Sequence, residues 1–214
     1  MLSVKRLSRA EQNERNRALV LAAARQVFLS RGYHAATVEE IADEAGFSRG
    51  VVYSRFGTKA DMFLALLTDR IAERAAQNAA AAATPAGAGL SGVHELARRA
   101  EAATPGWRLL VTEFRVHAAR DPELSDRYAA VHAATVDGLA STVAAAAERA
   151  GHALAVPARQ VAELLLAVET GLALEQLTDP SAVGLGQLPP VLSELAALLA
   201  LSPASREMTD VRQP

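Results

Sequence analysis

The most informative side chains of this sequence lie within positions 37–59, where hydrogen-bond donors recur at helical intervals. Ser48 can cap a helix that starts at Arg49, and Arg49 and Tyr53 then stand one turn apart on its outer face. Arginine can read guanine edges or grip a phosphate, and a tyrosine hydroxyl can donate to a phosphate. Gly50 costs about 1 kcal/mol within a helix, so we infer that another molecule approaches closely there. These side chains predict contact with nucleic acid.

A pair of short helices would hold these side chains in place. Thr37 and Glu40 have the spacing of a capping box, and Gly46 ends the helix that they open. The turn that follows leads into a second helix, Arg49–Phe56, whose inner side carries Val52. Two short helices joined in this way form a helix-turn-helix, which places its second helix in the major groove of DNA.

Two helix starts add sites for phosphate. Thr37 and Lys59 each lie at a helix N-terminus, where free amides and the helix dipole favour an anion. A solvated helical hairpin without a partner would not account for an exposed Gly50 together with an exposed Tyr53. We therefore expect contacts with double-stranded DNA from the following residues: Thr37, Ser48, Arg49, Gly50, Val51, Tyr53, Ser54 and Lys59.

The charge distribution agrees with a DNA-binding head on an acidic body. The chain has 214 residues and a formal net charge of -2. Residues 1–59 carry ten Lys or Arg against six Asp or Glu, so this segment is positive and the remainder is negative. Because affinity for phosphate is local and depends on salt, a small negative net charge does not exclude a nucleic-acid partner.

Helical periodicity extends along the chain, and no segment alternates over a useful length as a strand would. We therefore expect an all-α fold. Beyond the two short helices, the expected helices are Asn13–Arg31, Lys59–Ala83, Val93–Ala103, Pro105–Ala119, Pro122–Ala150, Pro157–Thr178 and Pro189–Leu201. Prolines lie near most of these starts, where a missing amide costs nothing.

Catalytic and cofactor motifs are missing or out of context. The lack of cysteine removes disulfides, thiolate metal sites and thiol nucleophiles. Gly87 to Gly92 match a dinucleotide-binding spacing, but no strand precedes them, so a loop between helices is the better interpretation. The five histidines are scattered, and no serine lies in a nucleophile elbow. We expect no enzyme activity, no metal and no cofactor.

The first fifteen residues alternate charged and polar side chains and lack the apolar run of a signal peptide. The longest uncharged stretch, Ala75 to His94, is too rich in Ala and Gly to span a membrane. We expect a cytoplasmic protein with no membrane partner.

The run from Thr37 to Lys59, with Phe28 and Gly32-Tyr33 before it, resembles the TetR family of bacterial transcriptional regulators. The resemblance implies a homodimer that binds a palindromic operator, most often as a repressor that a small molecule releases. It also implies a flexible basic arm over 1–12, a helix-turn-helix head over 13–60, an effector-binding and dimerisation body over 61–201 and a frayed tail over 202–214.

The segment from Val161 to Leu174 is similar to the penultimate helix of that family, where the last two helices of each subunit form a four-helix interface. Each of the last two expected helices also carries an apolar stripe. The residues expected at the dimer interface are Val161, Leu164, Leu165, Val168, Leu172, Leu192, Leu195 and Leu199.

The resemblance also implies a small molecule held among the middle helices. The expected contacts are Trp107, Phe114, His117, Tyr128 and Glu169, and the aliphatic composition suits a small apolar effector. Two alternatives stay open. One is a DNA-binding protein of the same fold without an effector, and the other is a helical small-molecule carrier that has lost DNA binding.

Overall fold

The structure is a computed structural model that describes residues 8–82, 106–149, 151, 153–179 and 181–182. All regular structure in these residues is α-helical, which confirms the expected all-α fold. The first four helices are α1 (Arg9–Ala35), α2 (Val38–Ala45), α3 (Arg49–Phe56) and α4 (Lys59–Ala82). They are followed by α6 (Trp107–Ala118), α7 (Pro122–Arg149) and α8 (Ala158–Thr178).

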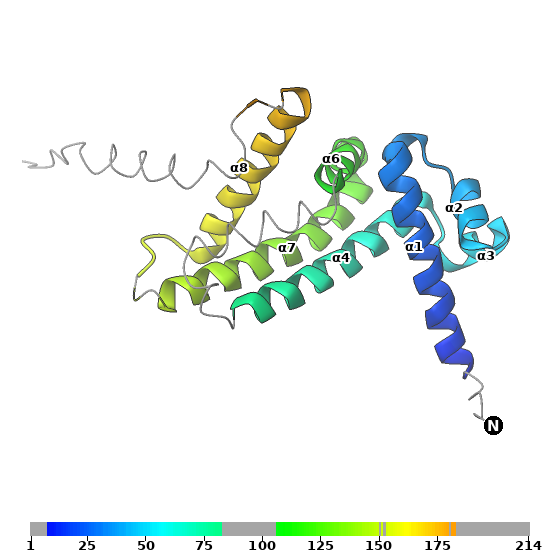
Figure 1. The fold of residues 1–214 in the computed structure, drawn as a ribbon, viewed down its shortest axis with the longest axis horizontal. Helices are drawn as coiled ribbons and strands as arrows, with labels where there is room; N and C mark the ends of the chain where they lie inside the picture. The colour runs from blue at the N-terminus through cyan, green and yellow to red at the C-terminus, as the bar shows by residue number, and fades with distance from the viewer. Residues whose placement is uncertain (1–7, 83–105, 150, 152, 180, 183–214) are drawn as a thin grey trace, which may run out of the picture.

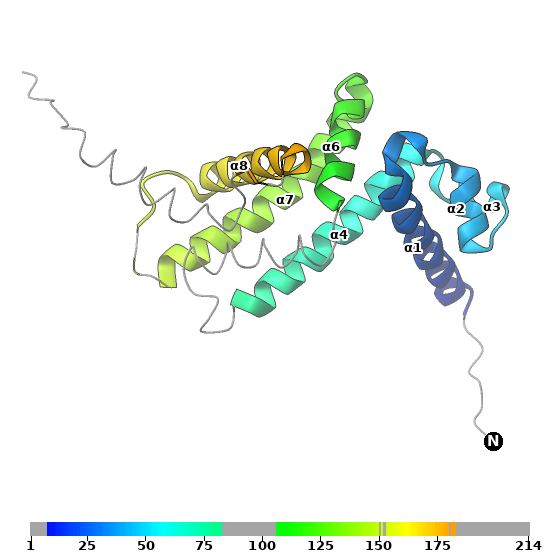
Figure 2. The same cartoon turned by 45° about the horizontal axis from the view of Figure 1, so that its top comes forward.

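The helices divide into a head and a body (Figure 1). Helices α1, α2 and α3 pack together at one end of the molecule, and α4 runs from this head into the body. Helix α7 packs beside α4, α8 packs on α7, and α6 lies between the head and the body, in contact with α1 (Figure 2). Helices α4 and α6 therefore belong to both parts of the molecule.

The first helix begins earlier than expected. The Ser8 hydroxyl accepts a hydrogen bond from the Glu11 amide at 3.2 Å, and the Glu11 carboxylate accepts one from the Ser8 amide at 2.6 Å. This capping box starts α1 at Arg9 rather than at Asn13. The flexible arm expected over 1–12 is corrected accordingly, because residues 9–12 are helical.

Several expected features fall outside the described residues. These are the helices at Val93–Ala103 and Pro189–Leu201, the loop from Gly87 to Gly92, most of the arm, the tail over 202–214, and three expected interface residues, Leu192, Leu195 and Leu199.

A bend at Gly32 shapes the joint between head and body. Gly32 has φ 76° and ψ 168°, a conformation that side chains other than glycine rarely adopt, and it interrupts α1 near its end. A Cβ atom there would also lie 2.8 Å from a carboxylate oxygen of Glu113 on α6. The bend turns Tyr33 into the interior, where the side chain is 2% exposed.

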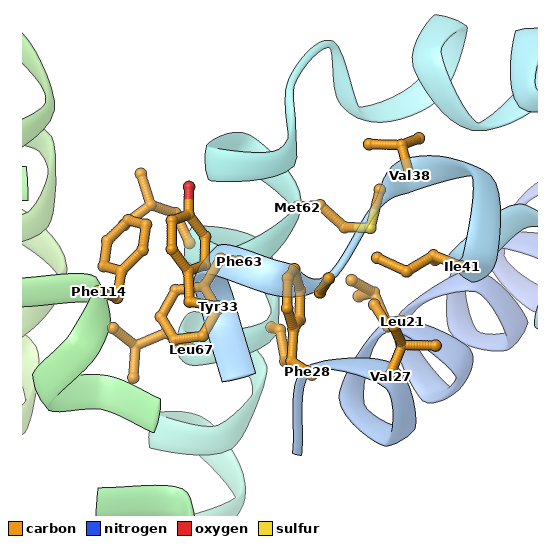
Figure 3. Close-up of a cluster of buried hydrophobic side chains, with 14 of the residues drawn as sticks. Leu21, Val27, Phe28, Tyr33, Val38, Ile41, Met62, Phe63, Leu67 and Phe114 are labelled. Carbon is orange, nitrogen blue, oxygen red and sulfur yellow. The ribbon is translucent and has the colours of Figure 1, made fainter. Parts of the chain in front are cut away.

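An aromatic cluster joins three helices at this bend (Figure 3). Tyr33 of α1 packs edge-on against both Phe63 of α4 and Phe114 of α6, with ring centroids 5.5 Å and 4.9 Å away. Phe63 stacks on Phe114 at 4.3 Å and meets Phe28 of α1 edge-on at 5.4 Å. Phe28, Phe63 and Phe114 are each 0% exposed, so the cluster is the centre of the core that head and body share.

Polar groups secure the same joint. The Glu113 carboxylate accepts a hydrogen bond from the Tyr33 amide at 2.7 Å. The Lys59 ammonium, at the start of α4, donates to the carbonyl oxygens of Tyr33, His34 and Ala36 at 2.8, 3.2 and 2.9 Å. The end of α1 is thus bound by one side chain from α6 and another from α4.

Replacing Phe63 by Ala should lower the free energy of unfolding by about 3–5 kcal/mol, because it opens a void among three rings. Denaturant unfolding followed by circular dichroism measures this loss. Leu19→Ala on α1 is the control, since Leu19 is 45% exposed and its loss should cost no more than about 0.5 kcal/mol. Equal losses in the two variants would contradict the position of Phe63 in the shared core.

Candidate nucleic-acid interface and ligand cavity

The second short helix presents one face to solvent. The Ser48 hydroxyl caps α3 by accepting from the Val51 amide at 3.4 Å, and Gly46, with φ 71°, makes the turn that precedes it. Val52 is 0% exposed and anchors the inner side of α3 against the head. Six residues expected to contact DNA are exposed together on and around the outer face: Ser48, Arg49, Gly50, Val51, Tyr53 and Ser54.

Arg49 is oriented by two neighbours on this face. Its guanidinium lies 2.6 Å from the carboxylate of Glu39 on α2, and its central carbon lies 5.1 Å from the centroid of the Tyr53 ring. Both members of the Arg49–Glu39 pair are exposed, so the pair contributes little to stability. A phosphate or a base edge can therefore replace Glu39 as the partner of Arg49 at small cost.

Gly50 leaves open space on the outer face of α3. A Cβ atom built at Gly50 would meet no atom of the chain within 4 Å, and its backbone φ is not positive. Neither packing nor backbone geometry within the chain requires glycine at this position. A requirement for glycine must then come from a molecule that lies against α3.

At the two helix N-termini, Thr37 and Lys59 make hydrogen bonds within the chain. The Glu40 carboxylate accepts from the Thr37 amide at 3.0 Å and from the Thr37 hydroxyl at 3.2 Å, so the cap of α2 uses both groups. Thr37 is exposed, whereas the Lys59 side chain is directed at three carbonyl groups of its own chain. Burial lowers the pKa of Lys59. In the structure the Lys59 side chain fastens α4 to the end of α1, so a phosphate at Lys59 would have to compete with these hydrogen bonds.

A cavity of about 230 Å³ opens between α4, α6, α7 and α8. Its apolar walls include Leu67, Ile71, Trp107, Val111, Leu139 and Leu166. Of the expected effector contacts, Trp107, Tyr128 and Glu169 line this cavity. Phe114 and His117 do not, because they lie on the other face of α6 at the aromatic joint, where the His117 ring is 5.1 Å from Tyr33.

Charged residues that the sequence did not single out also line the cavity. Arg108 of α6 pairs with Glu169 of α8 at 3.4 Å, and the two side chains are only 19% and 13% exposed. Arg70, Arg74 and Arg115 add further positive charge to the lining. Arg108 and Arg115 lie seven residues apart, on the helix face that carries Trp107 and Val111. The seven-residue spacing is the feature of the sequence that could have predicted both arginines on the same face of the helix as Trp107.

The interface stripe expected on α8 is half-buried except at Leu164, which is exposed. Leu164 is 65% exposed and Leu177 is 52% exposed, while Ala162 is the residue of α8 that the chain fully buries. Val161, Leu165, Val168 and Leu172 are half-buried. Leu164 and the half-buried residues beside it leave part of this apolar stripe accessible in a single chain.

Two kinds of site are absent from the described part of the chain. None of its helices is long and apolar enough to cross a membrane. No three His, Cys, Asp or Glu side chains within it are grouped so that they could hold a metal ion.

Two family models match the chain in its two parts. Residues 20–66 match the model described as bacterial regulatory proteins, tetR family, and residues 86–201, more than half of the chain, match the C-terminal region of BetI-type transcriptional repressors. The chain belongs to the TetR family. The protein is therefore a TetR-type transcriptional regulator with a DNA-binding head, as its sequence resemblance implied.

Curated relatives of this TetR-family chain align with it over short stretches. The transcriptional activator FasR of Mycolicibacterium smegmatis is 46% identical over 63 residues, which are 29% of this chain and 28% of FasR. The repressor BepR of Brucella suis is 44% identical over 62 residues, 29% of each chain. Less than a third of either relative is therefore aligned.

Solved structures share the fold at low identity. FadR of Bacillus subtilis, in complex with stearoyl-CoA, is 17% identical with a TM-score of 0.66, covering 83% of this chain and 96% of FadR. A transcriptional regulator from Saccharomonospora viridis, in complex with choline, is 21% identical with a TM-score of 0.64, covering 86% and 96%. At these identities the likeness establishes the fold alone.

Replacing Gly50 by Ala should stabilise the protein and weaken its binding to DNA. Alanine favours the helix by about 0.8–1 kcal/mol, and its methyl group meets nothing within the chain. That same methyl group would meet DNA docked on α3. Thermal unfolding and electrophoretic mobility shift on a bound genomic fragment measure the two effects. Gly138→Ala on α7, where a Cβ also meets nothing within 4 Å, is the control that should gain stability without losing DNA affinity.

Replacing Lys59 by Met should reduce the free energy of unfolding by about 1–3 kcal/mol, because three carbonyl groups lose their common donor. The slope of affinity for random DNA against salt should stay the same. Arg49→Met, on the exposed face of α3, is the control that should reduce this slope by about one unit. Unchanged stability with a reduced slope in Lys59→Met would instead favour the original assignment of Lys59 to phosphate.

Proposed function

We propose that this protein is a homodimeric repressor that binds a palindromic operator and is released from it by a small molecule. The observation that carries the proposal is the exposed face of α3, where Arg49, Gly50 and Tyr53 lie together without an internal packing role. Such a face suits a helix that enters the major groove. Because its target is the chromosome, we place its action in the cytoplasm.

Repression is favoured by the C-terminal region. The family model that matches residues 86–201 describes repressors, and BepR, which aligns with 29% of this chain, is also a repressor. FasR aligns with an equal share and is an activator, so these short alignments do not select the direction of regulation. We take the match to the body as the better guide because it covers the larger part of the chain.

A dimer is supported by the apolar surface of α8. A second copy of α8 would cover Leu164, which one chain leaves exposed, together with its half-buried neighbours Leu165 and Val168. A two-fold axis through this surface would present two copies of α3, and two such helices bind half-sites related by the same symmetry. We therefore propose a palindromic operator.

An effector is supported by the position of the cavity relative to the head. One face of α6 lines the cavity through Trp107 and Val111, while Glu113 and Phe114 of the same helix hold Tyr33 at the joint. A molecule that moves α6 would also move the end of α1. FadR in complex with stearoyl-CoA and the Saccharomonospora viridis regulator in complex with choline are chains of this fold that bind small molecules, and we propose that this cavity takes a small effector with an apolar body.

Release from DNA then follows from linkage. An effector that binds the free dimer more tightly than the operator complex weakens DNA binding by the ratio of the two affinities. A ratio of about 100 corresponds to about 2.7 kcal/mol.

Selection of genomic DNA fragments on the purified protein tests the DNA-binding part of this proposal. We expect the bound fragments to share a palindrome, and we expect affinity for that palindrome to exceed affinity for random DNA of equal length by at least about 1,000-fold. Bound fragments without a shared sequence would contradict an operator, and a failure to retain any fragment would favour the carrier alternative.

Replacing Leu164 by Glu should raise the dissociation constant of the dimer by about 100-fold or more, because the two-fold axis buries the charge twice. Sedimentation velocity measures the oligomeric state, and the palindrome should no longer be bound at concentrations that saturate the wild type. Leu19→Glu, an exposed leucine on α1, is the matched control and should remain a dimer. A Leu164→Glu variant that sediments as the wild type does would contradict the interface on α8.

A further inference from the structure

The cavity combines apolar walls with positive charge. Its described lining includes four arginines, two from α4 and two from α6, and a single carboxylate, Glu169. Arg108 lies 3.4 Å from Glu169, so that carboxylate has a cationic partner within the lining. Arg70 also contacts Glu73, at 3.6 Å, on the exposed side of α4. Arg74 likewise has an interaction partner. Arg115 is then the arginine of the described lining on which the electrostatic preference of the cavity depends most.

Arg115 contacts a ring rather than a carboxylate. Its guanidinium carbon lies 5.9 Å from the centroid of the Tyr128 ring, and its side chain is exposed, so it stands at the edge of the cavity. Stacking on an aromatic ring leaves the N–H groups at the rim of the guanidinium directed outward. These groups match the geometry of a carboxylate or a phosphate.

Two neutral groups lie beside Arg115. The His132 ring stacks on Tyr128 with centroids 5.7 Å apart. Burial, followed by the positive charge of Arg115, lowers the pKa of His132, while Glu163 acts in the opposite direction. Burial raises the pKa of Tyr128, so this phenol stays protonated. The corner thus offers one cation and two neutral side chains that can donate hydrogen bonds.

We propose that the effector carries an anionic group, a carboxylate or a phosphate, that Arg115 binds at the edge of the cavity while an apolar body lies against Trp107 and Val111. This proposal rests on the effector role assigned to the cavity above. It adds the sign of the ligand charge and the residue that selects it. A cationic ligand of the same length would meet Arg115 as a like charge.

Trp107 makes the proposal directly measurable. It is the one tryptophan of the sequence, and it lines the cavity, so its fluorescence reports on ligands there. Decanoate, decyl phosphate, decanol and decyltrimethylammonium have the same apolar chain and differ in the head group. Each is titrated into the full-length wild-type protein without DNA.

We expect decanoate or decyl phosphate to bind at least about tenfold more tightly than decanol, and decyltrimethylammonium to bind more weakly than decanol. Which of the two anions binds more tightly distinguishes a carboxylate from a phosphate ligand. Arg115→Gln should remove the preference for the anion and leave the affinity for decanol unchanged. Arg115→Lys should retain part of the preference, because it keeps the charge but loses the paired donors. Arg120→Gln, an exposed arginine just beyond α6 and outside the cavity lining, is the matched control and should behave as the wild type.

Three outcomes would overturn the proposal: tighter binding of the cation than of both anions, an anion preference that survives Arg115→Gln, and no fluorescence response to any probe. The effector role is tested separately by adding the bound anion to the operator complex. An anion that binds through Arg115 but leaves operator affinity unchanged would support the anion site and overturn the proposed release mechanism.

Discussion

The backbone just after Gly32 is the constraint on which the rest of the structure depends. The bend interrupts α1, so the polar groups of residues 33–36 cannot all be satisfied by a continuing helix. The Glu113 carboxylate of α6 accepts a hydrogen bond from the Tyr33 amide, and the Lys59 ammonium of α4 donates to three carbonyl oxygens of the same segment. The Tyr33 ring is meanwhile enclosed by Phe63 and Phe114 of the same two helices. The head is therefore held by the helices that line the cavity.

This arrangement explains how a small displacement of a helix in the body can be transmitted to the head. A packed core does not deform continuously, so a shift of α6 must either carry Tyr33 with it or break contacts at the joint. Helix α6 makes the connection short, because residues that line the cavity and residues that hold Tyr33 alternate along it. Helix α4 adds a second connection, since Leu67 and Arg70 line the cavity two to three turns after Lys59. Under the proposed mechanism, a ligand that favours one position of α6 or α4 would favour one position of the head and of α3.

The parts of the fold that depend on local signals could be predicted from the sequence. The capping box at Thr37 and Glu40, the glycine turn at Gly46 and the buried Val52 determine α2 and α3 within a few residues, and the structure has all three. The parts that depend on tertiary packing could not. In the sequence, Lys59 at a helix start indicates an anion site. Only the folded structure brings the carbonyls of residues 33, 34 and 36 beside its ammonium group. Phe114 and His117 were expected in the cavity because the sequence does not show which face of α6 packs against α1. In the structure, the face that carries these two residues packs against α1.

The charges of the head explain why a single copy would bind DNA weakly. Arg31 pairs with Glu40 at 3.5 Å, Arg49 pairs with Glu39, and the Arg55 guanidinium donates to the Asn13 carbonyl oxygen at 2.8 Å. Lys59 is bound to three carbonyls, so each of these four cations already has an internal partner. Phosphates must compete with those partners, and α2, which carries Glu39, Glu40, Asp43 and Glu44 but no Lys or Arg, repels the backbone beside them. This competition lowers the number of net phosphate contacts per head, and with it the non-specific affinity. In the proposed dimer, the specific affinity then comes from two heads on one operator, so the surface of α8 that carries Leu164 would be as necessary to DNA recognition as α3 itself.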